Sequence, residues 1–198
     1  MTEEGPRERI LAAALELFVE KGYFNTNIPD ISKKSHCSVG SIYHHFVNKE
    51  EIADQLYKDG SALFRKALLE VIDPEGQVKD NIRGLIIAFL YFAEKEKLLA
   101  KYLWLARHSE FLSQKVYRPT VIGLDPLGRV LAKVIKKAIR SGEIASLKAE
   151  VIWVIIFGIP VSFLLDWLDG NTKILPSAVA TALADASWSA LKSSVAKV

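Results

Sequence analysis

The sequence has little of what several classes of protein depend on. Its one cysteine, Cys37, excludes an internal disulfide framework and a cysteine-based zinc site. Glycine and proline are widely spaced, and strand-like alternation of apolar and polar residues is rare. The chain shows no phosphate-binding loop, no Ser-His-Asp order, no pair of catalytic acids and no metal-ligand cluster. We therefore expect no enzyme, no cofactor and no bound metal, and we keep a helical enzyme as an alternative.

Long apolar runs are also scarce. The longest candidate, from Val151 to Leu165, contains Pro160 and is bounded by Glu150 and Asp166. It falls short of the roughly 20 residues that a membrane-spanning helix needs, so it predicts a helix buried in a core or a subunit interface. The first ten residues contain acids and no apolar core, which argues against a signal peptide. We expect a cytoplasmic protein with no membrane partner.

Charge of one sign is not abundant either. The formal net charge is +3, and the first 58 residues hold seven Lys or Arg against nine Asp or Glu. Bulk charge therefore does not support nucleic-acid binding by the N-terminal part. Basic residues gather instead on one face of a predicted helix: Arg129, Lys133, Lys136, Lys137 and Arg140. We interpret that face as solvated, with a second anion site as the alternative.

Helical periodicity is abundant, and we expect an all-α fold of about nine helices. Caps and stops predict three N-terminal helices, from Pro6 to Lys21, Pro29 to Ser35 and Val39 to Phe46. Six more are expected at about Lys49–Val71, Val78–Glu96, Leu98–Arg107, Pro126–Arg140, Lys148–Leu168 and Pro176–Ala196. Only the stretch from Ser109 to Asp125 predicts no clear element.

The third helix has the properties of a DNA-recognition helix. Ser38 and Gly40 let its N-terminal end approach DNA closely, where unpaired N–H groups attract phosphate, and Tyr43 follows on the same helix. Small or polar side chains around that end and at the starts of the neighbouring helices are the candidate DNA contacts. They are Thr26, Asn27, Ser38, Val39, Gly40, Ser41, Tyr43, His44 and Lys49.

The segment from Gly22 to Lys49 resembles the N-terminal signature of the tetracycline-repressor (TetR) family. The matching positions are Gly22, Tyr23, Thr26, Ile28, Asp30, Ile31, Ser38, Gly40, Tyr43, His45, Phe46 and Lys49. The resemblance covers about the first 58 residues. It implies a homodimer that binds a palindromic double-stranded operator through residues 1–48, with residues 49–198 forming a helical body for ligand binding and dimerisation. One departure is His36, which stands where the family has a turn glycine.

The resemblance also implies a pocket for a small effector in the helical body. Seven of the chain's nineteen aromatic residues lie between residues 89 and 117. An aromatic cavity with a few polar groups suits an apolar or flat ligand, although core packing explains most such residues equally well. The candidates are Phe89, Phe92, Tyr102, Trp104, His108, Phe111 and Tyr117.

The last two predicted helices are suited to association. Alanines recur every four residues from Ala178, which allows a neighbouring helix to pack closely, and the preceding helix is apolar on nearly every side. Two helices from each subunit would form a four-helix dimer interface, and an intramolecular core is the alternative. The candidate interface residues are Trp153, Phe157, Leu164, Ala182, Ala186 and Ala190.

The sequence thus predicts a ligand-responsive transcriptional regulator, most simply a repressor that an apolar or aromatic effector releases from its operator. The alternative is an interaction protein that kept the fold and lost DNA binding, supported by the acidic N-terminal balance and by His36.

Overall fold

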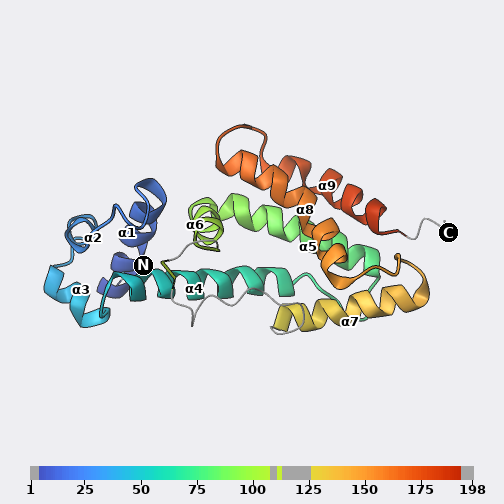
Figure 1. Cartoon of the computed structure of the whole chain (residues 1–198), viewed down its shortest axis with the longest axis horizontal. Helices are drawn as coiled ribbons and strands as arrows, with labels where there is room; N and C mark the ends of the chain where they lie inside the picture. The colour runs from blue at the N-terminus through green and yellow to red at the C-terminus, as the bar shows by residue number, and fades with distance from the viewer. Residues whose placement is uncertain (1–4, 108–110, 113–125, 193–198) are drawn as a thin grey trace. The chain divides into compact units, whose positions relative to one another are not determined.

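The computed structural model describes residues 5–107, 111–112 and 126–192, and its regular elements there are helices (Figure 1). They are α1 (Pro6–Glu20), α2 (Ile28–Ser35), α3 (Val39–His45), α4 (Lys49–Leu69), α5 (Val78–Lys95), α6 (Lys97–Arg107), α7 (Pro126–Ser141), α8 (Ala149–Leu168) and α9 (Pro176–Leu191). The predicted all-α class is confirmed, and each expected helix is present.

The end of the last helix was predicted wrongly. The backbone leaves the helical region at Lys192, with φ −52° and ψ 137°, and Lys192 forms an isolated antiparallel bridge with Ile144. The Ala145 N–H donates to the Leu191 carbonyl at 3.0 Å. This contact with a residue far away in the chain ends α9 before the expected Ala196, which lies outside the described residues.

The chain divides into two compact units. Unit 1 comprises residues 1–63 and 98–118, and unit 2 comprises residues 64–97 and 119–198. The sequence predicts a boundary after residue 48 between a DNA-binding part and a helical body. The two units are defined by contacts and do not test this functional boundary, which stays a prediction.

Unit 1 contains a small three-helix cluster of α1, α2 and α3. Its centre is formed by Ile10, Ala14, Ile31 and Ile42, none of which is exposed. Burying each isoleucine contributes roughly 1.5–3 kcal/mol, so a few side chains hold three short helices together. Gly22, with φ +86°, ends α1 in a conformation that favours glycine.

The described part of α6 packs closely on α4 within unit 1. A Cβ atom placed on Gly60 would lie 2.6 Å from a Leu99 methyl carbon, so any larger residue here would force the Leu99 side chain to shift. The Tyr102 hydroxyl donates to the Ala53 carbonyl at 2.8 Å, and its ring is buried. Burial raises the pKa of this hydroxyl well above its ordinary value, with a smaller contribution from Asp54. Tyr102 therefore joins α6 to α4 as a neutral donor.

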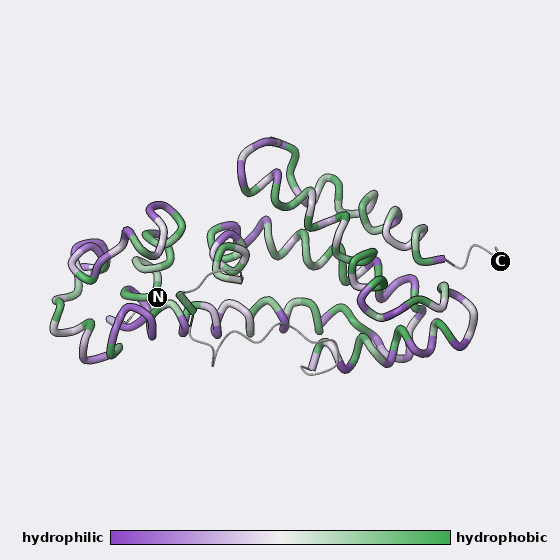
Figure 2. The backbone as a smooth tube through the Cα atoms, viewed as in Figure 1, coloured by the Kyte–Doolittle hydropathy of each residue, from purple (hydrophilic) through white to green (hydrophobic). Residues whose placement is uncertain are grey.

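Unit 2 is built around α5, which contacts α7, α8 and α9, while α8 also packs on α9. Figure 2 shows α7 alternating between hydrophilic and hydrophobic residues, as expected for a helix with one buried face. By length and composition α8 could span a membrane, with a mean hydropathy of 2.2 over its most apolar window. One such helix is weak evidence for a span, because core and interface helices have the same composition.

Candidate nucleic-acid interface

A reciprocal cap determines where α2 begins. The Asn27 side chain accepts a hydrogen bond from the Asp30 N–H at 2.8 Å, and the Asp30 carboxylate accepts one from the Asn27 N–H at 3.4 Å. Pro29 stands in the first turn, where its missing N–H costs no helical hydrogen bond. Asn27 is exposed at the N-terminal end of α2, where a phosphate would be attracted.

The turn between α2 and α3 keeps a left-handed residue without glycine. His36 has φ 54° and ψ 31°, and it is the one non-glycine residue with positive φ in the described ranges. Side chains hold the turn on both sides: Ser32 Oγ donates to the Cys37 carbonyl at 2.6 Å, and the Cys37 N–H donates to Ser35 Oγ at 3.3 Å. His36 therefore adopts the left-handed conformation that glycine favours, at a conformational cost of roughly 1–2 kcal/mol.

Helix α3 presents a small, polar, exposed end. Ser38 Oγ accepts from the Ser41 N–H at 3.1 Å and so caps the helix. Ile42 is completely buried on the inner side, whereas Tyr43 is 54% exposed on the outer side. The predicted contacts on this outer side are Ser38, Val39, Gly40, Tyr43 and His44, all exposed, with Ser41 half-buried beside them.

Gly40 is not required by the packing of the protein itself. A Cβ atom at this position would meet nothing closer than Ser38 Oγ at 3.9 Å. Its backbone is helical, so it needs no positive φ either. The absence of a side chain at an exposed helix start leaves the backbone open to a close approach from outside.

Two predicted contact residues face the protein instead. Thr26 is buried, and its hydroxyl lies 2.9 Å from the Gly22 carbonyl, which it can reach as a donor at the end of α1. The Lys49 ammonium donates to the carbonyls of Tyr23 and Thr26 at 2.8 and 2.6 Å and lies 4.2 Å from the centre of the Tyr23 ring. Both side chains therefore hold the loop between α1 and α2, and their contact with DNA stays a prediction that this geometry does not favour.

The loop between α1 and α2 also contacts the segment after α6. The rings of Tyr23 and Phe111 stack with centroids 4.3 Å apart, and Phe24 meets Phe111 edge-on. Burial raises the pKa of the Tyr23 hydroxyl, helped by the nearby Glu50 and Asp54, and burial lowers the pKa of Lys49. Sequence reasoning missed this stack because 88 positions separate its two rings.

Structural roles account for several acids of the N-terminal part. Asp30 caps α2, and Glu51 accepts a hydrogen bond from the Val47 N–H at 2.6 Å before α4. Glu16 and Glu20 pair with Lys34 at 2.6 and 3.5 Å. The formally acidic balance of this part therefore does not mean an acidic surface at the end of α3.

The predicted effector residues divide between the two units. Phe89 and Phe92 are buried in unit 2, where both contact the ring of Phe64. Tyr102, Trp104 and Phe111 belong to unit 1. His108 and Tyr117 lie outside the described residues. Their grouping in one pocket stays a prediction.

The predicted interface residues fall into two sets within unit 2. Three alanines of α9, Ala182, Ala186 and Ala190, are exposed. Leu164 is buried, and Trp153 stacks on Phe157 with centroids 5.1 Å apart. Phe157 in turn meets Phe89 of α5 edge-on at 5.7 Å, so this pair packs inward in the single chain. The exposed apolar residues of α8 are others: Val151, Val154 and Ile159.

Within the described ranges, no three His, Cys, Asp or Glu side chains come together as metal ligands. The rings of His44 and His45 lie 5.2 Å apart at the exposed end of unit 1. His44 is exposed there, whereas His45 is half-buried beside Phe46.

Comparison with known proteins assigns the helix-turn-helix segment to a family. Residues 10–56 match the model of bacterial regulatory proteins of the tetR family. The chain is 29% identical over 110 residues to a biofilm operon icaADBC HTH-type negative transcriptional regulator from Staphylococcus epidermidis, covering 56% of this chain and 58% of that protein. It is 27% identical over 169 residues to the fatty acid metabolism regulator protein of Bacillus subtilis, covering 83% and 84%.

Solved structures extend the likeness of fold to nearly the whole chain. A bacterial regulatory protein in the tetR family from Rhodococcus RHA1 has a TM-score of 0.75 at 18% identity, covering 96% of this chain and 98% of that one. A TetR family transcription regulator from Marinobacter aquaeolei VT8 has a TM-score of 0.74 at 14% identity, covering 94% and 95%. At such identities the likeness bears on the fold alone.

Proposed function

The chain belongs to the tetR family of bacterial regulatory proteins, and on that premise we propose that it is a homodimeric repressor released from a palindromic operator by a small apolar effector. The single observation that carries DNA binding is the exposed end of α3, where Ser38, Gly40 and Tyr43 face outward over a buried Ile42. In a dimer, two such ends would meet successive major-groove faces about 34–36 Å apart. A cytoplasmic location follows from that role.

Two exposed surfaces of unit 2 support the proposal of a dimer. The exposed side of α9 consists largely of alanine, and α8 exposes Val154 by 69%. Small residues on one helix and branched apolar residues on the next permit close helix–helix packing across a two-fold axis. We propose that these exposed residues, more than Trp153 and Phe157, meet the partner subunit.

The aromatic cluster of unit 2 is our candidate for the effector site. Phe64, Phe89, Phe92, Trp153 and Phe157 contact one another in series. The buried Trp153 indole N–H has no hydrogen-bond acceptor within the described part of the chain. A buried donor without a partner is costly, and an apolar effector with one oxygen acceptor would satisfy it. The relative named as a fatty acid metabolism regulator aligns over 83% of this chain, which agrees with an apolar effector.

The contacts inside unit 1 supply a route by which α6 could act on the helix-turn-helix. Tyr102 ties α6 to α4, and Phe111 stacks on Tyr23, whose carbonyl is bound by Lys49 at the start of α4. A displacement of α6 would therefore pull on α4 and on the loop after α1 together. A coupling free energy of about 1–3 kcal/mol lowers operator affinity roughly 5- to 150-fold.

Fluorescence anisotropy with duplexes selected from a random library tests the DNA-binding part. We expect one preferred, palindromic duplex, with affinity that falls steeply with salt. The Tyr43→Ala/His44→Ala variant should bind this duplex at least about tenfold more weakly, while the control variant Lys58→Ala, at an exposed position of α4, should bind normally. A wild-type protein without sequence preference would instead support the interaction protein that lost DNA binding.

A further inference from the structure

The helix-turn-helix has few cations that are not already in contact with another group of the protein. Its first 58 residues contain seven Lys or Arg, and five of these contact an aromatic ring, a sulfur atom, a carboxylate or a backbone carbonyl within unit 1. The five are Arg7, Arg9, Lys21, Lys34 and Lys49. Helix α3 itself contains no Lys or Arg. Because cations at phosphates supply much of the affinity for DNA, the surface proposed for the operator lacks the ordinary source of it.

Histidine is the residue type that can supply the missing charge. Three of the chain's four histidines, His36, His44 and His45, lie in the helix-turn-helix. His44 is exposed in the last turn of α3, and its one contact among the described residues is with the ring of His45. An imidazole can gain a positive charge between about pH 5 and pH 8, and the C-terminal end of a helix favours that charge. Among the exposed side chains of α3, only His44 can therefore become a cation.

No group of the protein stabilises that charge by an ion pair. Helix α3 packs on α1 and α2, and α4 follows it in the chain. The charged side chains on α1, on α2 and in the first turn of α4 are Arg7, Glu8, Arg9, Glu16, Glu20, Asp30, Lys33, Lys34, Lys49, Glu50 and Glu51. Within the described ranges, none of their carboxylates lies within 4.0 Å of the His44 ring. A phosphate of the operator would thus be the first anionic partner of this ring.

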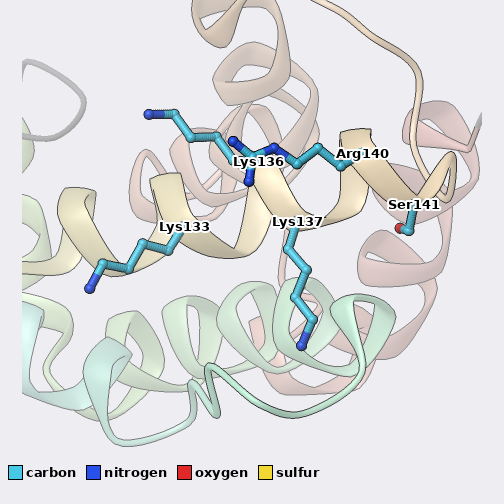
Figure 3. Close-up of a pocket in the computed structure, with 5 residues that line it drawn as sticks. All are labelled: Lys133, Lys136, Lys137, Arg140 and Ser141. Atoms are coloured by element: carbon cyan, nitrogen blue, oxygen red, sulfur yellow. The ribbon is translucent and has the colours of Figure 1, made fainter.

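The basic face of α7 in unit 2 differs from this surface. Lys133, Lys136, Lys137 and Arg140 lie on that face. Figure 3 shows Lys136 and Arg140 extending to one side of the helix and Lys133 and Lys137 to the other. Their charged ends diverge and do not converge on one ligand, which agrees with the interpretation of a solvated face. On α3, by contrast, a single titratable group stands on a surface that has an anionic partner in the proposed function.

We propose that His44 takes up a proton when the protein binds its operator, so that an imidazolium contacts the phosphate backbone and affinity rises as the pH falls. This inference rests on the DNA binding proposed above. A nearby anion favours the charged form of an imidazole, so the DNA itself draws the proton onto the ring. Charged rings of His44 and His45, with centroids 5.2 Å apart, would repel each other. We therefore expect about one proton per subunit.

Fluorescence anisotropy with the selected duplex, at constant ionic strength between about pH 6 and pH 8, tests this coupling. The wild type should bind at least about tenfold more tightly at the lower pH. Calorimetry in buffers with different heats of ionisation should count up to about two protons taken up per dimer. The plot of log affinity against log salt should be steeper by about 1.8 at the lower pH, because two more phosphates per dimer are neutralised.

Three variants separate a contact by His44 from a general effect of charge. His44→Gln cannot gain a charge and should lose most of the pH dependence. His44→Lys carries a fixed charge, so it should bind with little pH dependence and more tightly than the wild type at about pH 8. The control is His36→Asn, which removes another exposed imidazole of unit 1 and keeps a residue that tolerates positive φ. This control should keep the pH dependence of the wild type.

Three results would overturn the coupling and leave the proposed function standing. They are a wild-type affinity that does not change with pH, a His44→Gln variant with the pH dependence of the wild type, and an equal loss of pH dependence in His36→Asn. Absence of sequence-dependent duplex binding at every pH would instead refute the DNA binding and this coupling with it. Circular dichroism at both ends of the pH range should show each variant folded, because both positions are exposed.

Discussion

The helix-turn-helix of unit 1 and the outer surface of α8 and α9 in unit 2, our proposed dimer surface, are built in different ways. In the helix-turn-helix, the starts of α2, α3 and α4 are each capped by a side chain, from Asn27, Ser38 and Asn48. In unit 2, the N-cap residues of α8 and α9 make no side-chain cap, although the Ser177 N–H in the first turn of α9 donates to the Glu94 carboxylate of α5; both helices expose alanine or valine. The first region depends on individual residues at particular positions, whereas the second depends on composition and shape.

The largest effect is expected from a charge on the surface of α8. We predict that Val154→Asp dissociates the proposed dimer, since an unpaired charge buried in each subunit costs roughly 3–5 kcal/mol. Analytical ultracentrifugation should show a dimer dissociation constant raised more than about a hundredfold. Val154→Thr, which keeps the shape, should remain mostly dimeric. Two results would contradict the proposed dimer surface. One is a monomeric wild type, and the other is a Val154→Asp variant that dimerises as tightly as the wild type.

The next effect is expected in the small core of unit 1. Ile42→Ala should lower the free energy of unfolding by roughly 2–5 kcal/mol, because this fully buried side chain would leave a cavity between three short helices. Urea denaturation measures the loss. Val39→Ala, three positions away on the exposed side, is the matched control and should cost far less. Equal losses at both positions would contradict the assignment of a buried and an exposed side to α3.

A smaller effect, with a defined pH dependence, is expected at Tyr102. Loss of its hydrogen bond to Ala53 in Tyr102→Phe should cost about 0.5–1.5 kcal/mol at neutral pH. Because the pKa of Tyr102 is raised in the folded protein, its hydroxyl keeps its proton at alkaline pH values at which the unfolded chain, with a pKa near 10, has lost it. The folded state then binds more protons, so wild-type stability falls as pH rises above about 10.

Denaturation of wild type and Tyr102→Phe between neutral pH and about pH 11 measures this difference. The advantage of the wild type should shrink in the alkaline range and not in the acidic range. Tyr91→Phe, at an exposed position of α5, should leave the profile unchanged. A wild-type advantage that grew with pH would mean that Tyr102 is not a buried neutral donor.

The smallest effect, of opposite sign, is expected in the turn of the helix-turn-helix. His36→Gly should stabilise the protein by up to about 1 kcal/mol, because relief of roughly 1–2 kcal/mol of strain at positive φ is partly offset by the greater freedom of glycine in the unfolded chain. His44→Gly, in the last turn of α3, should instead destabilise it by roughly 0.5–1 kcal/mol, because glycine is a poor helix former. Thermal unfolding of the pair distinguishes a backbone effect from the loss of an imidazole, which both variants share.

The helices and their starts could be predicted from the sequence because their signals are local. A cap such as Ser38 acts on a backbone group three positions away, and the stripe of apolar residues in α1 repeats within one or two turns. The exposed end of α3 was predicted for the same reason. The end of α9 was not, because it depends on a bridge from Lys192 to Ile144, 48 positions earlier.

The sequence by itself determined the fold class, the order of the helices and the exposed, polar end of α3. Only the tertiary structure decided that Thr26 turns inward, that Lys49 binds two backbone carbonyls and that Tyr23 stacks on Phe111. The physical reason is distance along the chain. Local hydrogen bonds and helical periodicity depend on residues that are close in the sequence. Whether a polar side chain faces solvent or protein depends on partners that are far away in the sequence.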